Sequence, residues 1–221
     1  MKTCLIVTGG QIQMDFAGPF LEQQTFDLVI AVDGGLETVK FLGVIPDAVV
    51  GDFDTVDPQV FQEYHRLSHI RWEIHKPEKN ETDTELAVHT AIQLGADYLT
   101  ILGATGGRLD HMLANIHLLD DCHRQQVRAE ILDAQNKVFI VEKGYRFERD
   151  KCFGKYISFV PLTEQVRGIT LTGFKYPLRE KDISIGKEAG LCISNELSRE
   201  TGEIAIESGR VICIESRDFE R

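Results

Sequence analysis

Short apolar runs alternate with segments of helical periodicity over the first part of the chain. Several runs end at glycine or aspartate, as buried strands followed by tight turns do. After one of them, Pro58 suits a first helical turn, and Val60, Phe61 and Tyr64 then share one face. The strand-like runs cover residues 4–7, 28–32, 47–50, 70–74 and 98–102. This alternation predicts an α/β fold with a Rossmann-like parallel sheet and flanking helices.

The pattern changes near Lys137. From there on, short segments alternate between apolar and polar residues, and helical periodicity is absent. Ser208-Gly209, between the last two segments, predicts a hairpin. The clearest segments cover residues 138–141, 156–160, 203–207 and 211–215. They predict a small antiparallel β-sandwich or roll. We therefore expect two domains, residues 1–134 and 135–221.

The composition narrows the classes of function. Of 221 residues, 43% are hydrophobic and 27% are charged, which is typical of a globular protein, and the formal net charge is −11. Without a cluster of Lys or Arg, the chain offers no track for a phosphate backbone, so we expect no nucleic-acid partner. A small anionic substrate would need a metal ion to offset the surrounding acidic groups.

Neither the cysteines nor the N-terminus indicates an oxidising compartment or a membrane. The five cysteines form no Cys-x-x-Cys pair, which argues against a disulfide framework and against a zinc site. The first apolar run is too short for a signal peptide, and no segment approaches the length of a membrane span. We therefore expect a cytoplasmic protein with no membrane partner.

Two carboxylates lie in Gly51-Asp52-Phe53-Asp54, directly after an apolar run. On extended backbone, side chains two residues apart project to the same side. No Lys or Arg within several residues neutralises Asp52 and Asp54. Mg²⁺ would do so, because one or two carboxylates usually hold it together with substrate phosphates. An Asp-x-Asp pair also occurs in turns and helix caps, so this segment alone leaves both interpretations open.

Two glycine-containing segments also follow predicted strands, where ligands bind in an open parallel sheet. Asp33-Gly34-Gly35 alone favours a simple turn over a ligand-binding loop. In residues 103–108, glycines let backbone N–H groups approach phosphate, and Arg108 adds a fork-shaped donor. The segment is not a Walker A loop, because the Gly-Lys-Ser/Thr ending is missing. The helix that follows is expected to have an apolar face made of Met112, Leu113, Ile116 and Leu119.

The segment Thr82-Asp83-Thr84-Glu85 predicts the start of another helix. Thr82 and Glu85 fit a capping box, and Gly95 suits the C-terminal end. Asp83, in the first turn, complements the helix macrodipole. The same helix end can also point at a ligand, with Asp83 as a further metal ligand. The two roles are compatible.

These segments, in this order, resemble the thiamine pyrophosphokinase family. Any one of the motifs is weak, whereas the whole set in register is specific. The similarity extends from about the first strand to the C-terminus. It rests on residues 33–35, 51–55, 79–85, 106–111, 113–115, 172–178 and 194–196.

The resemblance implies an ATP-binding α/β catalytic domain, a thiamine-binding β-sandwich domain and a homodimer with thiamine near the subunit interface. It implies transfer of a pyrophosphoryl group from ATP to the hydroxyethyl group of thiamine, with release of AMP. The implied Mg²⁺ ligands are Asp52, Asp54 and Asp83. The implied nucleotide-binding residues are Asp33, Gly34, Gly35, Lys79, Thr82, Thr105, Gly106, Gly107 and Arg108. The implied thiamine-binding residues are Tyr176, Ser194 and Asn195. The implied catalytic residues are Asp83, Arg108 and Asp110, and either carboxylate could accept the proton of the thiamine hydroxyl group.

Two positions depart from the family pattern. Asn80 stands where the family commonly has a carboxylate, and Tyr176 stands where it often has Trp. Three alternatives stay open: a pyrophosphokinase for another alcohol such as a pterin, a glycosyltransferase that uses Asp52 and Asp54, and a non-catalytic thiamine or nucleotide sensor. Release of AMP from ATP that depends on added thiamine separates them.

Overall fold

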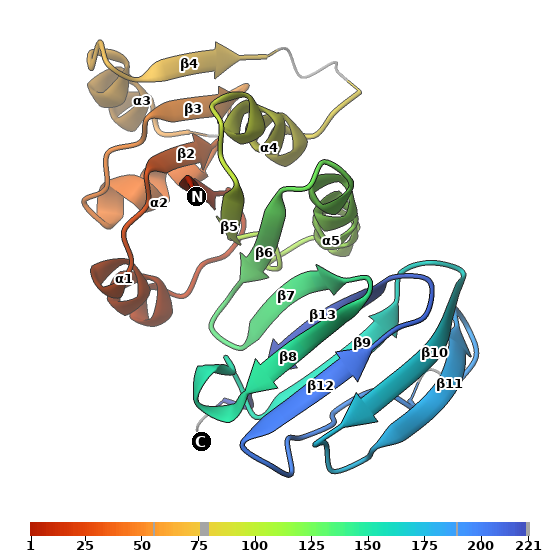
Figure 1. Cartoon of the computed structure of the whole chain (residues 1–221). Coiled ribbons are helices and arrows are strands. Elements are labelled where there is room, and N and C mark those ends of the chain that lie inside the picture. Colours follow the sequence, from red (N-terminus) through yellow and green to blue (C-terminus); the bar gives the residue numbers. More distant parts are fainter. Residues whose placement is uncertain (55, 76–79, 189, 220–221) are drawn as a thin grey trace. The chain divides into compact units, whose positions relative to one another are not determined.

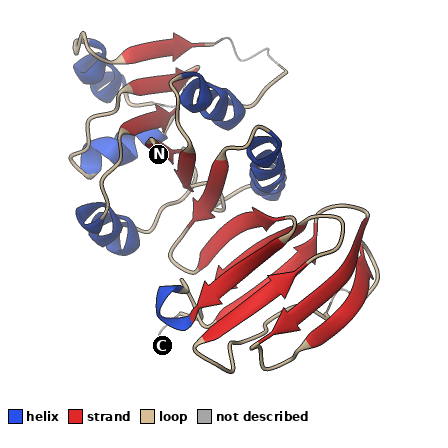
Figure 2. Cartoon of the chain, viewed as in Figure 1, coloured by secondary structure: helices blue, strands red, loops and turns tan. Residues whose placement is uncertain are grey.

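A computed structural model describes residues 1–54, 56–75, 80–188 and 190–219 of the chain. It divides into two compact units, Met1–Ala134 and Gln135–Arg221 (Figure 1). Helices and parallel strands alternate in the N-terminal unit, whereas the C-terminal unit consists mainly of antiparallel strands (Figure 2). The predicted α/β fold with an additional antiparallel β part is confirmed.

Parallel strands form the sheet of the N-terminal unit, in the order β4-β3-β2-β1-β5-β6. The chain builds outward from β1 to β4 and then adds β5 and β6 on the other side of β1. The topological switch point of the sheet therefore lies beside β1. Leu5, Ile6, Ile30, Leu99 and Ile101 are fully buried, as expected for strands covered on both faces. The strands are β1 (Thr3–Val7), β2 (Leu28–Val32), β3 (Ala48–Gly51), β4 (Arg71–Ile74), β5 (Tyr98–Leu102) and β6 (Arg128–Leu132).

Helices cover both faces of this sheet (Figure 1). α2 and α4 both pack on β1 and β2, from opposite sides, while α3 packs beside α2 and α5 beside α4. The helices are α1 (Met14–Gln23), α2 (Gly35–Phe41), α3 (Pro58–His65), α4 (Asp83–Gln93) and α5 (Leu109–Arg124). In the described part of the chain, none of the helices combines the length and the apolar character that a membrane crossing requires.

Two helices begin where the sequence predicts, α3 at Pro58 and α4 after the capping residue Thr82, and both starts are capped by a side chain. Asp57 accepts a hydrogen bond from the backbone N–H of Gln59 at 2.7 Å and caps α3, whose first residue is Pro58. The Oγ1 atom of Thr82 accepts a hydrogen bond from the backbone N–H of Glu85 at 3.2 Å and caps α4. These bonds satisfy N–H groups that have no partner within the helix.

Two helical features differ from the expectation. α1 was not predicted, because Pro19 stands inside it, and proline usually breaks a helix. The predicted apolar face of α5 is partly wrong, since Leu113 is 54% exposed. Two polar residues belong to the buried stripe, so hydrophobicity alone places the stripe incorrectly. The buried residues of α5 are Asn115, Leu118, Leu119, Asp120 and Cys122.

Two antiparallel sheets make up the C-terminal unit, one in the order β7-β13-β9 and the other in the order β11-β10-β12-β8. Both sheets contribute side chains to one apolar core. Its centre contains Phe147, Phe159 and Phe174, which pack edge to face with centroids 5.7–5.9 Å apart. The elements are β7 (Asn136–Val141), β8 (Gly144–Glu148), η1 (Arg149–Lys151), β9 (Tyr156–Pro161), β10 (Gln165–Thr172), β11 (Leu178–Ser184), β12 (Thr201–Ala205) and β13 (Val211–Ser216).

The hairpin predicted at Ser208-Gly209 is wrong. β12 pairs with β8 and β10, whereas β13 pairs with β7 and β9, so the two strands belong to different sheets. The carbonyl O of Ser208 accepts a hydrogen bond from the N–H of Arg167 at 2.8 Å. Gly209, with a φ of +94°, lies in the connection between the sheets. A local turn signal does not reveal which strands pair.

The substitution Phe147→Ala should lower the free energy of unfolding by about 3–5 kcal/mol, because it leaves a cavity in the core. The side chain is 1% exposed. Urea denaturation followed by circular dichroism measures the loss. Tyr145→Ala is the control, since this neighbouring ring lies 4.7 Å from Phe147 but is 40% exposed. Equal losses for the two variants would contradict the assignment of Phe147 to the core.

Candidate functional site

Three loops that follow strands approach one another backbone to backbone in the N-terminal unit. A Cβ added to Gly35, after β2, would lie 2.0 Å from the carbonyl O of Val7 at the end of β1. A Cβ added to Gly10, after β1, would lie 2.0 Å from the carbonyl O of Gly103 after β5. Only glycine permits such an approach. The ends of β1, β2 and β5 therefore form one surface at the carboxyl edge of the sheet, where ligands bind in this architecture.

Asp33 links this surface to the acidic turn after β3. Its Oδ1 atom accepts hydrogen bonds from the backbone N–H groups of Asp52 at 3.0 Å and Phe53 at 3.4 Å. Gly51 leaves room for the carboxylate, because a Cβ there would lie 1.8 Å from that oxygen. Asp52 in turn accepts a hydrogen bond from the N–H of Asp54 at 3.2 Å. The structure thus brings the two predicted acidic segments into one group.

Negative charge accumulates around Asp33. Burial, together with the charges of Asp83 and Asp52, raises the pKa of the Asp33 carboxyl group from 3.8 to about 6. Asp83 is the first residue of α4, so carboxylates from three elements interact at this edge. Hard cations such as Mg²⁺ take carboxylate oxygens as ligands, and the chemistry of this group therefore fits the ion. Within the described residues, no three His, Cys, Asp or Glu side chains are already gathered as metal ligands.

The structure gives less detail for three other predicted site residues, which are Thr82, Asp54 and Lys79. The hydroxyl oxygen of Thr82 already accepts the N–H of Glu85, so this side chain begins the helix that carries Asp83. Asp54 lies on the exposed side of its turn. Lys79 lies outside the described residues.

Two polar side chains hold the glycine-rich turn after β5. Thr105 Oγ1 donates a hydrogen bond to Asp133 at 2.7 Å. The buried side chain of Asn115, on α5, donates one to the carbonyl O of Ala104 at 3.0 Å. Gly107 has a φ of +101° and open space where a Cβ would stand. The turn has a fixed base and an open tip directly before a helix, an arrangement in which N–H groups can meet an anion.

Arg108 and Asp110, both predicted as catalytic, form an ion pair. Arg108 donates from Nε and Nη2 to the two carboxylate oxygens of Asp110, at 3.1 and 2.5 Å. The hydrogen bond from Arg108 lowers the pKa of Asp110 to about 2, and the same bond raises the pKa of Arg108. Both side chains are exposed, so water screens their attraction. A phosphate group can therefore compete for the guanidinium.

Asn195 and Tyr176 are brought together in the C-terminal unit. The Asn195 side chain is buried, and its Oδ1 atom accepts the N–H groups of Tyr176 at 3.0 Å and Glu196 at 2.9 Å. Its Nδ2 atom donates to the carbonyl O of Tyr176 at 2.8 Å. Ser194 has a φ of +53°, and its N–H donates to the Oγ atom of Ser158 at 2.9 Å. The amide of Asn195 thus holds the backbone of Tyr176, whose side chain is 56% exposed.

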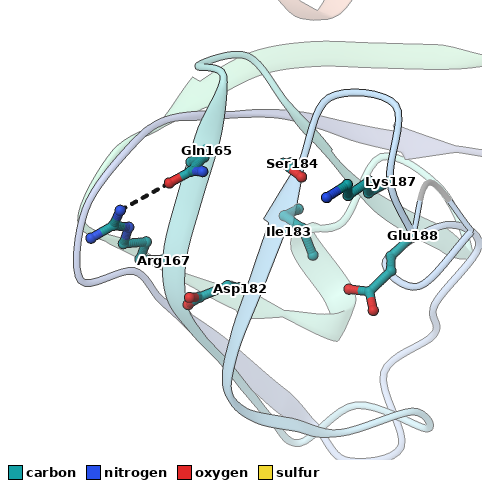
Figure 3. A pocket seen from close by; sticks show the side chains of 7 residues that line it. All are labelled: Gln165, Arg167, Asp182, Ile183, Ser184, Lys187 and Glu188. Carbon is teal, nitrogen blue, oxygen red and sulfur yellow. Dashed lines mark hydrogen bonds between the residues drawn. The ribbon is translucent and has the colours of Figure 1, made fainter.

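Among the described residues of the C-terminal unit, one cavity lies along β10 and β11 and another lies beside Glu196. One of about 620 Å³ lies along β10 and β11, where Arg167 and Lys187 share the lining with Asp182 and Glu188 (Figure 3). The predicted thiamine-binding residues do not line it. The other, of about 400 Å³, is lined in part by Glu196, whose backbone N–H binds Asn195. The second cavity is therefore the one next to the predicted thiamine-binding residues.

Sequence reasoning missed the loop after β1 as part of the site. Thr8 Oγ1 donates a hydrogen bond to the carbonyl O of Leu102 at 3.1 Å, and Thr8 is buried. A Cβ added to Gly106 would lie 2.8 Å from the Cβ of Gln11, so this loop packs against the glycine-rich turn. The only signal in the sequence is Gly9-Gly10 directly after the first strand.

A parallel sheet with carboxylates and a glycine-rich turn at its carboxyl edge defines a class of α/β proteins that bind phosphorylated ligands. Two family models match this chain. One is described as thiamin pyrophosphokinase, catalytic domain, and matches residues 21–131. The other is described as thiamin pyrophosphokinase, vitamin B1 binding domain, and matches residues 144–211.

Comparison with individual proteins agrees with both models. The chain is 38% identical to thiamine pyrophosphokinase of Bacillus subtilis (strain 168) over 223 residues, which cover 99% of this chain and 100% of that protein. A crystal structure of thiamine pyrophosphokinase from Bacillus subtilis matches with a TM-score of 0.86 at 34% identity, over 99% of this chain and 100% of that one. Thiamin pyrophosphokinase from Geobacillus thermodenitrificans matches with a TM-score of 0.83 at 31% identity, over 98% of each chain. The chain belongs to the thiamine pyrophosphokinase family.

In metal-free buffer, Asp33→Asn should become more stable relative to the wild type as pH rises. The folded-state pKa of Asp33, about 6, exceeds the usual 3.8, so the folded protein binds the proton more tightly than the unfolded chain does. The stability due to Asp33 is therefore complete below about pH 4 and is lost as pH rises through about 6. Asparagine keeps the acceptor oxygen and has no charge to titrate.

Urea denaturation from about pH 4 to about pH 7 measures this difference. Asp27→Asn is the control, because its stability relative to the wild type should change little over this range. The hydrogen bonds from Thr3 lower the pKa of Asp27 below 3.8, so its contribution is already present at about pH 4 and is lost only at lower pH. A constant stability difference between Asp33→Asn and the wild type across this range would contradict the raised pKa.

Proposed function

We propose that the chain transfers a pyrophosphoryl group from ATP to the hydroxyethyl group of thiamine, giving thiamine diphosphate and AMP. The observation that carries the proposal is the interaction of Asp33, Asp52 and Asp83 at one sheet edge, in a chain that matches the family over its full length. The match to a vitamin B1 binding domain supports thiamine as the acceptor.

Asp52, Asp54 and Asp83 would hold Mg²⁺. When bound, the ion would neutralise charge on the phosphate oxygens of ATP. The raised pKa of Asp33 supports this proposal, because it reflects a concentration of negative charge that a cation would offset. Asp33 would line the nucleotide side of the site together with Gly34, Gly35, Thr82 and Lys79.

The phosphates would lie on the glycine-rich turn of Thr105, Gly106 and Gly107, where the start of α5 favours anions. Arg108 would exchange the carboxylate of Asp110 for phosphate oxygens, because its fork-shaped donors fit both groups. The protein would act mainly through positioning and charge stabilisation, as phosphoryl-type transfer requires.

The hydroxyl oxygen of thiamine would attack the β-phosphorus of ATP, and AMP would leave. A carboxylate would take the proton of that hydroxyl group. Asp83 and Asp110 are the candidates. While Arg108 binds it, Asp110 has a pKa of about 2 and is a poor proton acceptor. Once Arg108 turns to phosphate, the main cause of this low pKa is removed, so Asp110 is a candidate base alongside Asp83.

Tyr176, Ser194 and Asn195 would form the thiamine side of the site. The exposed ring of Tyr176 would stack on the ring system of thiamine. Asn195 would act through the backbone of Tyr176, to which its amide is bonded. A homodimer, with thiamine near the subunit interface, and a cytoplasmic location complete the proposal, and light scattering of the purified protein tests the dimer.

Analysis by HPLC of the products formed from ATP, Mg²⁺ and thiamine tests the activity. We expect AMP and thiamine diphosphate in equal amounts, and none with a pterin alcohol as the control acceptor. AMP release with the pterin alone would indicate another acceptor. Nucleotide binding without AMP release would indicate a sensor.

Asp52→Asn and Asp54→Asn should each reduce thiamine-dependent AMP formation by about a hundredfold or more, because each removes a charge from the phosphate-facing group. The fold should be kept, as judged by circular dichroism. Asp97→Asn makes the same change at the opposite edge of the sheet, directly before β5, and should leave turnover unchanged. Full activity in either turn variant would overturn the metal assignment.

Tyr176→Ala should raise the KM for thiamine about tenfold and leave the KM for ATP unchanged, because the loss of one stacking contact costs about 1.4 kcal/mol. Tyr176→Trp should restore the lower value, since it keeps an aromatic face. Steady-state kinetics with each substrate varied in turn measures both constants. An unchanged KM for thiamine in Tyr176→Ala would remove this residue from the site.

A further inference from the structure

The turn Gly51–Asp54 has a backbone that ordinary residues rarely adopt. Phe53 has a φ of +59°, which for a bulky side chain is unfavourable, and Gly51 has a φ of +150°. Strain of this kind persists only where the surroundings hold the chain in place. On one side of the turn, the hydrogen bonds from Asp52 and Phe53 to the carboxylate of Asp33 do so.

On the other side, the ring of Phe53 lies in an aromatic cluster. We define the ring cluster as Phe53, Phe61, His65 and Trp72. Phe53 is 8% exposed, and its ring centroid lies 5.3 Å from Trp72 and 5.5 Å from Phe61. Phe61 also packs against Trp72 at 5.1 Å and stacks on His65 at 5.3 Å.

The ring cluster joins the turn after β3 to the helix α3 and the strand β4. Phe61 and His65 belong to α3, and Trp72 belongs to β4, the strand next to β3 (Figure 1). A ring pair of this geometry contributes about 0.5–1.5 kcal/mol beyond its buried area. Several such contacts can therefore stabilise a backbone conformation that costs about 1–3 kcal/mol.

We propose that Phe53 is a positioning residue: its ring, held in the ring cluster, fixes the two flanking carboxylates of Asp52 and Asp54 for cation binding. The proposal rests on the metal site of the proposed function. Because the ring of Phe53 is buried, neither neighbouring aspartate can point its side chain into the core unless the ring leaves the core. The hydrogen bond from the N–H of Asp54 to Asp52 is then kept in the one arrangement that the ring allows.

Glycine at position 53 separates positioning from simple backbone tolerance. Phe53→Gly adopts the positive φ without strain but has no anchor. If the turn needed only a residue that tolerates this φ, the variant would bind a cation as well as the wild type does. Phe53→Leu keeps an apolar anchor and loses only the ring contacts. Phe147→Leu is the matched control, since it removes a core ring from the C-terminal unit.

Binding of Mn²⁺ to the full-length protein, measured by electron paramagnetic resonance, tests the proposal without turnover. We expect Phe53→Gly to weaken Mn²⁺ binding by about tenfold or more, as losses of residues that support metal ligands do. We expect Phe53→Leu to weaken it by less, and Phe147→Leu to leave it unchanged. A folded Phe53→Gly variant with wild-type affinity would overturn the positioning role and leave the metal site intact.

Trp72 reports on the integrity of the ring cluster in each variant, because it is the only tryptophan of the chain and lies against Phe53. If Phe53→Gly does not fold, Phe53→Leu decides, and wild-type Mn²⁺ affinity in a folded Phe53→Leu variant overturns the positioning role of the ring. Equal Mn²⁺ binding by the wild type and Asp52→Asn would instead overturn the metal assignment, and the positioning role with it.

Discussion

Backbone contact between the loops after β1, β2 and β5 is the constraint on which the site depends. Gly35 lies against Val7, and Gly10 lies against Gly103, with no space for a Cβ at either glycine. A parallel sheet places all its carboxyl ends at one edge, and these glycines allow the loops there to pack without intervening side chains. The position of Asp33 depends on the same packing, because it places the end of β2 beside the turn after β3. There the carboxylate of Asp33 accepts a hydrogen bond from a backbone N–H group of that turn.

The same convergence concentrates charge and strain. Asp33 has a φ of +45° and Phe53 a φ of +59°, and both lie at the edge where the carboxylates interact. Neither feature stabilises the fold, since like charges repel and positive φ is unfavourable for these residues. Proteins retain such features where function needs them and stabilise them with neighbouring contacts. Here hydrogen bonds to a carboxylate and a set of aromatic rings supply that support.

Much of the N-terminal fold could be predicted from the sequence, because strands buried on both faces are continuous apolar runs. The start signals of α3 and α4, Pro58 in the first turn and Thr82 at the cap, are equally local, and both were correct. The wrong or missed predictions concern features that depend on distant parts of the chain. Pro19 lies inside α1, where proline is unfavourable, and Ser208-Gly209, which resembles a hairpin turn, connects strands of two different sheets. On α5, Leu113 is exposed whereas the polar residues Asn115 and Asp120 are buried, so the apolar pattern alone does not give the buried face.

The candidate site could be predicted as a set of residue types but not as a set of interactions. A motif that contains Asn195 suggests contact with a ligand, yet the buried amide is already bonded to the backbone of Tyr176. Arg108 suggests a phosphate donor, yet in this structure its donors are bonded to Asp110. Both side chains are already bonded, so their different burial separates the two kinds of role. In the proposed site, Asn195 would act on a ligand through the backbone that it holds, because releasing its buried amide would leave polar groups unpaired. The exposed pair of Arg108 and Asp110 loses little when it opens, so both members can turn to a substrate.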